Sequence, residues 1–164
     1  MRGRKQQQGV AAVELALIIG PMLILCFGIT ELGRALYQYN GLVKATRGAV
    51  RYLTTQSLAS PPPGETVDSI RLKARSLAMC GKEDCSSTAP LVPGLTLAQV
   101  SVCDPVACPA THNNIQTGQG SVNLVSVTIG GTGAAAFNFT SLVPWVVPSI
   151  TFSPVATTMA AQFF

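Results

Sequence analysis

The chain has 164 residues, enough for one membrane-anchoring helix and one modest domain but too few for two independent cores. Its net charge is +4, but Arg2, Arg4 and Lys5 lie within the first five residues, and the remaining chain carries 8 basic against 7 acidic side chains. A basic surface for phosphates is therefore not evident, and we expect no nucleic-acid partner.

The first predicted element is an apolar transmembrane helix over residues 10–29, in which Glu14 is the only charged residue. At about 1.5 Å per residue, this helix matches the roughly 30 Å hydrocarbon core of a bilayer. The basic cluster before it predicts a cytoplasmic N-terminus, and residues from about Thr30 onward then lie outside the cytoplasm.

Two other interpretations of this segment are a secretory signal peptide and a plain uncleaved anchor. The apolar run is longer than the roughly 7 to 15 residues of a signal peptide, and no small-x-small cleavage site follows it. In a plain anchor, Glu14 would cost about 2.5 to 3.5 kcal/mol in hydrocarbon and would need a partner. Glu14 would have no function if its carboxylate simply reached the membrane surface or stayed protonated.

Pro21 leaves the carbonyl of Leu17 without its helical donor, which predicts either a passive bend or a site that loosens on assembly.

The residues around Glu14 resemble a known family. Residues 9–17 read GVAAVELAL after a polar, basic segment, and this is similar to a type IV prepilin leader, which a prepilin peptidase cuts after the glycine. Downstream, residues 28–37, Asn40 and residues 45–52 resemble the TadE-like pseudopilins of the tight-adherence (Flp, type IVc) pilus system. The residues that carry this motif are Glu31, Gly33, Arg34, Asn40, Ala45, Arg47, Gly48 and Arg51. The chain departs from the pattern at Leu15, Pro21 and Val50.

The resemblance implies a processing site and a set of partners. Residues 1–9 would be the leader, with cleavage between Gly9 and Val10, and Glu14 would occupy the fifth mature position. Its carboxylate would then pair with the freed Val10 amine of a neighbouring subunit. The implied partners are the prepilin peptidase, other pilin subunits, the inner-membrane pilus assembly platform and the lipid bilayer. The implied location is a bacterial inner membrane, with the C-terminal domain in the periplasm or in an extracellular pilus.

A stalk helix over residues 30–58 should continue from the span, because apolar residues recur at three-and-four spacing. These residues are Leu32, Ala35, Leu36, Tyr39, Leu42, Val43, Ala49, Val50 and Leu53. The helix should end near Leu58, because the Pro-rich residues 60–64 cannot continue it. Arg47 and Arg51 lie four apart on one face, which is either solvated or a partner site.

Residues 65–164 should form an extracytoplasmic α+β domain. A short helix is expected over residues 65–79 and strands over residues 97–103, 122–129 and 150–161, which are rich in Val, Ile and Thr. Residues 137–148 should form a loop crossing the sheet, with Trp145 packed in the core or loop, or alternatively against the bilayer surface. The predicted fold class is α+β and pilin-like, a long N-terminal helix packed on a small antiparallel sheet.

Four of the five cysteines fall in this domain, and we expect Cys80, Cys85, Cys103 and Cys108 to form disulfides. Three connectivities are possible, and the two local pairs are preferred. A zinc site using His112 is the alternative, although an exposed loop histidine is the simpler interpretation.

The acidic residues form no pair suited to acid and base catalysis, so we expect no enzyme and no cofactor. The leading functional prediction is a minor pilin or pseudopilin. The alternative is an adhesin or binding module carried on a pilin anchor.

Overall fold

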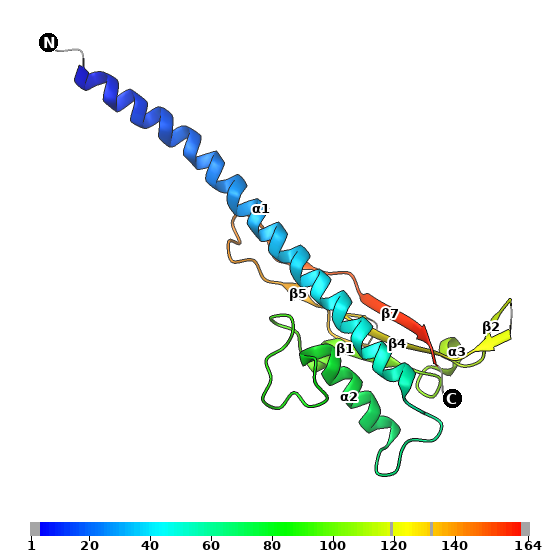
Figure 1. Ribbon diagram of the computed structural model, residues 1–164. Helices are drawn as coiled ribbons and strands as arrows, with labels where there is room; N and C mark the ends of the chain where they lie inside the picture. Colours follow the sequence, from blue (N-terminus) through cyan, green and yellow to red (C-terminus); the bar gives the residue numbers. More distant parts are fainter. Residues whose placement is uncertain (1–3, 119, 132, 162–164) are drawn as a thin grey trace. The chain divides into compact units, whose positions relative to one another are not determined.

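The computed structural model describes residues 4–118, 120–131 and 133–161 of the chain. Residues 1–3 of the predicted leader therefore lie outside the described residues. The chain divides into a first unit, residues 1–36 with 140–150, and a second unit, residues 37–139 with 151–164. Helix α1 (Arg4–Thr55) begins in the first unit and ends in the second, and Figure 1 traces it in blue to cyan.

The first unit contains the apolar part of α1. By length and composition, this helix is long and apolar enough to cross a membrane. The side chains from Val10 to Phe27 are all exposed. The core helix of a soluble domain would instead be mostly buried, so this segment has no covering layer among the described residues.

The second unit is built on a three-stranded antiparallel sheet in the order β1-β4-β7, formed by β1 (Val100–Cys103), β4 (Leu124–Ile129) and β7 (Val155–Ala160). Residues 37–55 of α1 and helix α2 (Val67–Cys80) supply the other apolar faces of its core. The helical residues in this core include Leu42, Ala45, Ala49, Val50, Leu53, Ile70 and Ala74. The predicted α+β fold, with a long N-terminal helix packed on a small antiparallel sheet, is confirmed.

Shorter elements complete the chain. They are η1 (Leu97–Gln99), α3 (Pro109–His112), the paired strands β2 (Ile115–Thr117) and β3 (Gly120–Val122), and the paired strands β5 (Asn138–Phe139) and β6 (Ile150–Thr151). In the β5–β6 region, the hydroxyl of Thr151 donates to Oδ1 of Asn138 at 2.7 Å.

Local chemistry sets several boundaries differently from the sequence prediction. Helix α1 ends at Thr55 rather than near Leu58, although Leu58 is still buried in the core. Helix α2 begins at Val67 rather than at residue 65, because Thr66 is its N-cap and exchanges capping hydrogen bonds with Ser69. The last predicted strand is split into β6 and β7 ahead of Val155, where Pro154 supplies no backbone donor.

The buried side of α1 differs from the predicted apolar stripe. In the first unit, Leu32 and Leu36 are exposed, whereas Glu31 and Ala35 are buried. A polar residue therefore occupies part of the inner face, because Glu31 finds hydrogen-bonding partners there.

A buried ion pair joins α2 to the loop after β1. The carboxylate of Asp104 is fully buried and accepts hydrogen bonds from Arg71 Nε at 2.6 Å and Arg71 Nη2 at 2.9 Å. It also accepts from the backbone N–H groups of Val106 at 2.9 Å and Ala107 at 2.8 Å. Burial alone would raise the pKa of Asp104, but these donors outweigh it and hold the pKa below its usual value. The ionised carboxylate is thus part of the folded structure.

Replacing Asp104 by Ala should lower the free energy of unfolding of the second unit by roughly 3 kcal/mol, because it leaves Arg71 partly buried without its main partner. The pKa of Asp104 is lower in the folded state, so its stabilisation is present above the unfolded-state pKa of about 3.9 and is lost as pH falls through the folded-state pKa. The wild type should therefore lose its advantage over Asp104→Ala only below about pH 4.

Urea unfolding of the detergent-solubilised full chain at several pH values measures this difference. The matched control is Asp68→Ala, which removes the exposed partner of the same arginine at 2.9 Å and should cost less than about 1 kcal/mol. Equal losses for the two variants at neutral pH would contradict the role assigned to Asp104.

Candidate assembly site

Glu14 is an isolated carboxylate on the apolar part of α1. It lies on one side of the helix with Val10, Val13 and Leu17, and its side chain is exposed. Among the side chains that the structure describes from residue 9 onward, no basic group forms an ion pair with it. A carboxylate placed among apolar side chains is suited to pairing with a cation supplied by another molecule. Its role in subunit assembly stays a prediction.

The predicted cleavage site lies one turn before Glu14. Gly9 and Val10 are both exposed on α1, and a Cβ added at Gly9 would meet no atom within 4 Å. No packing within the chain therefore requires a glycine at this position. Cleavage after Gly9 is not tested by this geometry.

Glu31, the second acid of α1, has the opposite environment. Only 4% of its surface is exposed, and its Oε2 accepts from Arg34 Nη2 at 2.8 Å and from the backbone N–H of Leu142 at 3.3 Å. The same guanidinium nitrogen of Arg34 donates to the carbonyl oxygen of Thr140 at 2.6 Å. Two motif residues one turn apart therefore hold the loop that begins at Thr140. We name residues 140–150 the helix-bound loop.

The helix-bound loop runs along α1 toward its apolar part. Its backbone contacts Arg34 and Glu31 first, and its Val146 Cγ1 then lies 3.7 Å from where a Cβ on Gly28 would stand. The N–H groups of Val146 and Val147 both donate to the carbonyl of Val143, at 3.0 and 3.1 Å, and this closes a single turn at the tip. The tip is thus held beside the last turn of the predicted span.

Trp145 lies on this tip and is 72% exposed. The preferred prediction, packing in the core or loop, is wrong for Trp145. The aromatic core of the second unit is instead formed by Phe137, Phe139 and Phe152, whose rings stack at centroid distances of 5.7 and 6.3 Å.

The other motif residues have different environments. Ala45 is buried in the core of the second unit, while Asn40, Arg47, Gly48 and Arg51 are exposed. A Cβ added at Gly33 or Gly48 would meet nothing within 4 Å, so packing within the chain does not require either glycine. The structure explains Glu31, Arg34 and Ala45 within a single chain and gives no internal reason for the remaining motif residues.

The cysteines are joined as Cys80–Cys85 and Cys103–Cys108, with Cα atoms 5.9 and 5.6 Å apart. This is the local pairing preferred from the sequence. The sulfurs of Cys103 and Cys108 lie near His112, but a disulfide sulfur is not the thiolate that zinc requires.

His112 is not the exposed loop residue that the sequence predicted. It ends α3, is partly buried, and its Nε2 lies 2.7 Å from the hydroxyl of Ser126 on β4. Burial lowers the pKa of His112 below its usual value. The ring therefore serves as a hydrogen-bonding link between α3 and the sheet.

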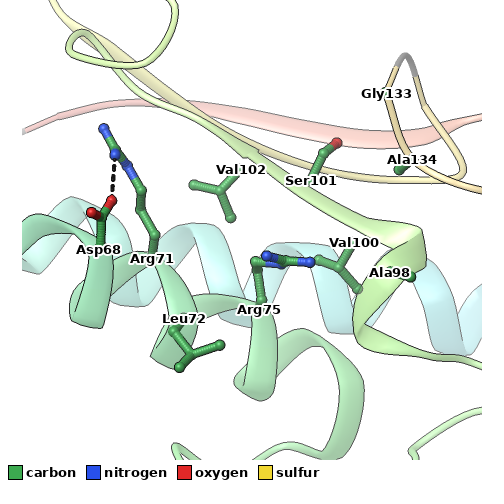
Figure 2. Close-up of a pocket in the computed structure, with 10 residues that line it drawn as sticks. All are labelled: Asp68, Arg71, Leu72, Arg75, Ala98, Val100, Ser101, Val102, Gly133 and Ala134. Atoms are coloured by element: carbon green, nitrogen blue, oxygen red, sulfur yellow. Dashed lines mark hydrogen bonds and ion pairs between the residues drawn. The ribbon is translucent and has the colours of Figure 1, made fainter.

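An open groove of about 470 Å³ lies between α2 and β1, and Figure 2 shows Arg71 and Arg75 reaching into it from α2. Arg71 is bound to Asp68 and Asp104, and Arg75 Nη2 donates to the carbonyl of Leu97 at 2.6 Å. The two guanidinium groups that line the groove are thus engaged in contacts that hold α2 against β1 and η1. We assign them structural roles.

An exposed apolar helix that continues into a segment packed on a small antiparallel sheet defines a pilin-like α+β plan. Residues 9–51 match the family model described as TadE-like protein. The resemblance predicted from the sequence is confirmed over these residues, which include Glu14, Glu31 and Arg34. No curated protein and no solved structure matches the chain.

Replacing Glu31 by Ala should release the helix-bound loop, because Arg34 and the N–H of Leu142 both lose their shared acceptor. Backbone amides of residues 140–147 should then exchange hydrogen several-fold faster, while amides of β4 keep their rates. Hydrogen exchange followed by mass spectrometry on the full chain measures both regions.

The matched control for this prediction is Leu32→Ala, the adjacent position whose side chain is exposed. It removes apolar surface from the same turn of α1 without touching the loop. Equal acceleration in both variants, or none in Glu31→Ala, would contradict the role given to Glu31.

Proposed function

We propose that this chain is a minor pilin or pseudopilin that assists assembly of a tight-adherence type IV pilus used for surface attachment. It would act as a priming subunit, a tip subunit or a fibre component. Residues 10–29 anchor it in a bacterial inner membrane, with the N-terminus cytoplasmic and the second unit periplasmic. The match of residues 9–51 to the TadE-like family supports this proposal, because it suggests a protein associated with the Tad pilus.

The observation that carries the proposal is the exposed apolar part of α1, residues 10–27, which lies inside the matched residues and has Glu14 as its only charged residue. Burying Glu14 alone in hydrocarbon costs about 2.5 to 3.5 kcal/mol, so the chain gains from a cationic partner at that depth. Cleavage after Gly9 creates such a cation, the Val10 amine, on every processed subunit. Helices from neighbouring subunits then offset each other's buried charges when they pack.

The proposed role is packing rather than turnover. The charged groups that line the groove between α2 and β1 hold α2 in place, because Arg71 is bound to Asp104 and Arg75 donates to the carbonyl of Leu97. The partners in this role are the prepilin peptidase, other pilin subunits and the inner-membrane assembly platform.

Processing should remove residues 1–9. Mass spectrometry of membranes from cells that contain the prepilin peptidase should find Val10 as the mature N-terminus, and cells that lack the peptidase should retain the whole leader. A Gly9→Leu variant should also retain the leader, since the enlarged side chain lies next to the cut. Recovery of intact residues 1–8 from peptidase-positive membranes would count decisively against the assignment.

The carboxylate of Glu14 should matter for assembly more than for insertion. Glu14→Ala makes the span more apolar, so membrane targeting should survive, while recruitment into pili should fall because the Val10 amine loses its partner. Fractionation measures the first effect, and counting pili per cell measures the second.

Leu15→Ala is the control for Glu14→Ala, since it alters the neighbouring exposed apolar residue and keeps the charge. Glu14→Gln tests the charge alone, because it keeps shape and hydrogen-bonding capacity. Normal pilus number with a correctly cleaved, inserted Glu14→Gln protein would show that the pairing role is wrong. Loss of attachment at normal pilus number, caused by changes in the second unit, would instead favour a pilin-anchored adhesin.

A further inference from the structure

We propose that the helix-bound loop is a second membrane contact, with Leu142 and Trp145 seated at the boundary between the lipid headgroups and acyl chains. The partner is the phospholipid bilayer that holds α1. This inference rests on the proposed membrane anchoring of α1 and adds a surface that the transmembrane helix alone does not provide.

Three contacts within the first unit fix the depth of the loop. Along the loop the order is Thr140, Leu142 and Val146, and their contacts on α1 are Arg34, Glu31 and Gly28. The loop therefore descends the helix as the chain advances, by about 9 Å between Arg34 and Gly28 at 1.5 Å per residue. Its tip reaches the level of Gly28, which lies inside the apolar segment predicted to span the bilayer. An inserted span brings the tip to the membrane surface.

The exposed side chains at the tip suit that depth. Leu142 is 76% exposed and Trp145 is 72% exposed, and Pro144 beside them is also exposed. No Asp, Glu, Lys or Arg occurs in the sequence after Asp104, so the loop carries no side-chain charge into the interface. Tryptophan is enriched at this boundary because its ring is apolar and its N–H still reaches polar groups. Clustered exposed apolar residues next to a membrane span are explained by contact with lipid.

The charges of the neighbouring helix turn agree with this placement. Glu31 would stand just beyond the span, and the loop covers it, so its carboxylate meets Arg34 and the N–H of Leu142 instead of lipid. The side chain of Arg34 keeps 30% of its surface exposed, about 9 Å above Gly28, which suits the headgroup layer. A second protein subunit is the rival occupant. The bilayer is favoured because α1 itself fixes the tip beside the apolar segment.

Trp145 is the only tryptophan of the sequence, so the tryptophan fluorescence of the intact protein reports on the environment of the helix-bound loop. We would reconstitute the full chain in vesicles of phosphatidylethanolamine and phosphatidylglycerol at a low ratio of protein to lipid. Fluorescence should be blue-shifted, protected from aqueous acrylamide, and quenched more strongly by lipids brominated near the headgroup than by lipids brominated deep in the acyl chain. Labelling of Cys26 with a membrane-impermeant maleimide reports separately on insertion, since this free cysteine lies within the span.

Two variants make the experiment specific. Leu142→Glu places a charge on the tip and should restore acrylamide quenching of Trp145. Leu91→Glu, at an exposed leucine of the second unit, should leave the quenching unchanged.

Each remaining outcome overturns a defined statement. Protected Cys26 with a Trp145 that acrylamide quenches fully would overturn the loop contact and leave the anchoring intact. Reactive Cys26 would overturn the anchoring and the loop contact together. Protection of Trp145 that appears only at a high ratio of protein to lipid would assign the tip to a second copy of the chain and overturn the lipid contact.

Discussion

The exposed apolar surface of α1 is the constraint on which the rest of the structure depends. From Val10 to Phe27 no residue of the helix is covered by another part of the described chain. In water, such a surface would drive aggregation, and a bilayer or the helices of other subunits remove it from water. In the second half of the same helix, the apolar surface is removed from water within the chain, because Leu42, Ala49 and Leu53 pack into a core with the sheet. One helix therefore has an internal partner for one half and requires an external partner for the other.

The two acids of α1 illustrate how environment separates identical side chains. Glu14 and Glu31 both fall within the residues that match the TadE-like family. Glu31 is neutralised and hydrogen-bonded within the chain by Arg34 and the backbone of Leu142, so it needs nothing from outside. Glu14 has an exposed carboxylate among apolar side chains. The first is a structural acid, and the second has the surroundings of a group that acts between molecules.

Local patterns predicted much of this fold, and partners distant in the sequence account for most of what the patterns missed. Hydropathy predicted the apolar helix, and the two local cysteine pairs, which were preferred among three possible connectivities, are the ones that form. The helical stripe placed Leu32 and Leu36 inside, because an apolar pattern cannot anticipate that Glu31 would be stabilised by a backbone N–H 111 residues away. The ion pair of Arg71 with Asp104 was missed for the same reason, since 33 residues separate the two.

The misassigned aromatic residue has a related cause. Size and polarity alone favour burial of Trp145 in a small domain. The second unit fills its aromatic cluster with Phe137, Phe139 and Phe152, and the loop that carries Trp145 is bound to α1 instead. The backbone path of the helix-bound loop places Trp145 outside the aromatic cluster. No periodicity in the sequence predicts this path.

The loop contact demands particular side chains on only one of its two sides. Glu31 accepts from the N–H of Leu142 and Arg34 donates to the carbonyl of Thr140, so both contacts are made to backbone atoms. Almost any side chain at positions 140 and 142 preserves them, whereas the helix must supply a carboxylate and a guanidinium. The side of the contact that demands particular residues lies within residues 9–51, and the side that demands only a backbone lies outside them. A loop held in this way is free to carry whichever exposed side chains suit its surroundings, and Trp145 is the residue that this chain places there.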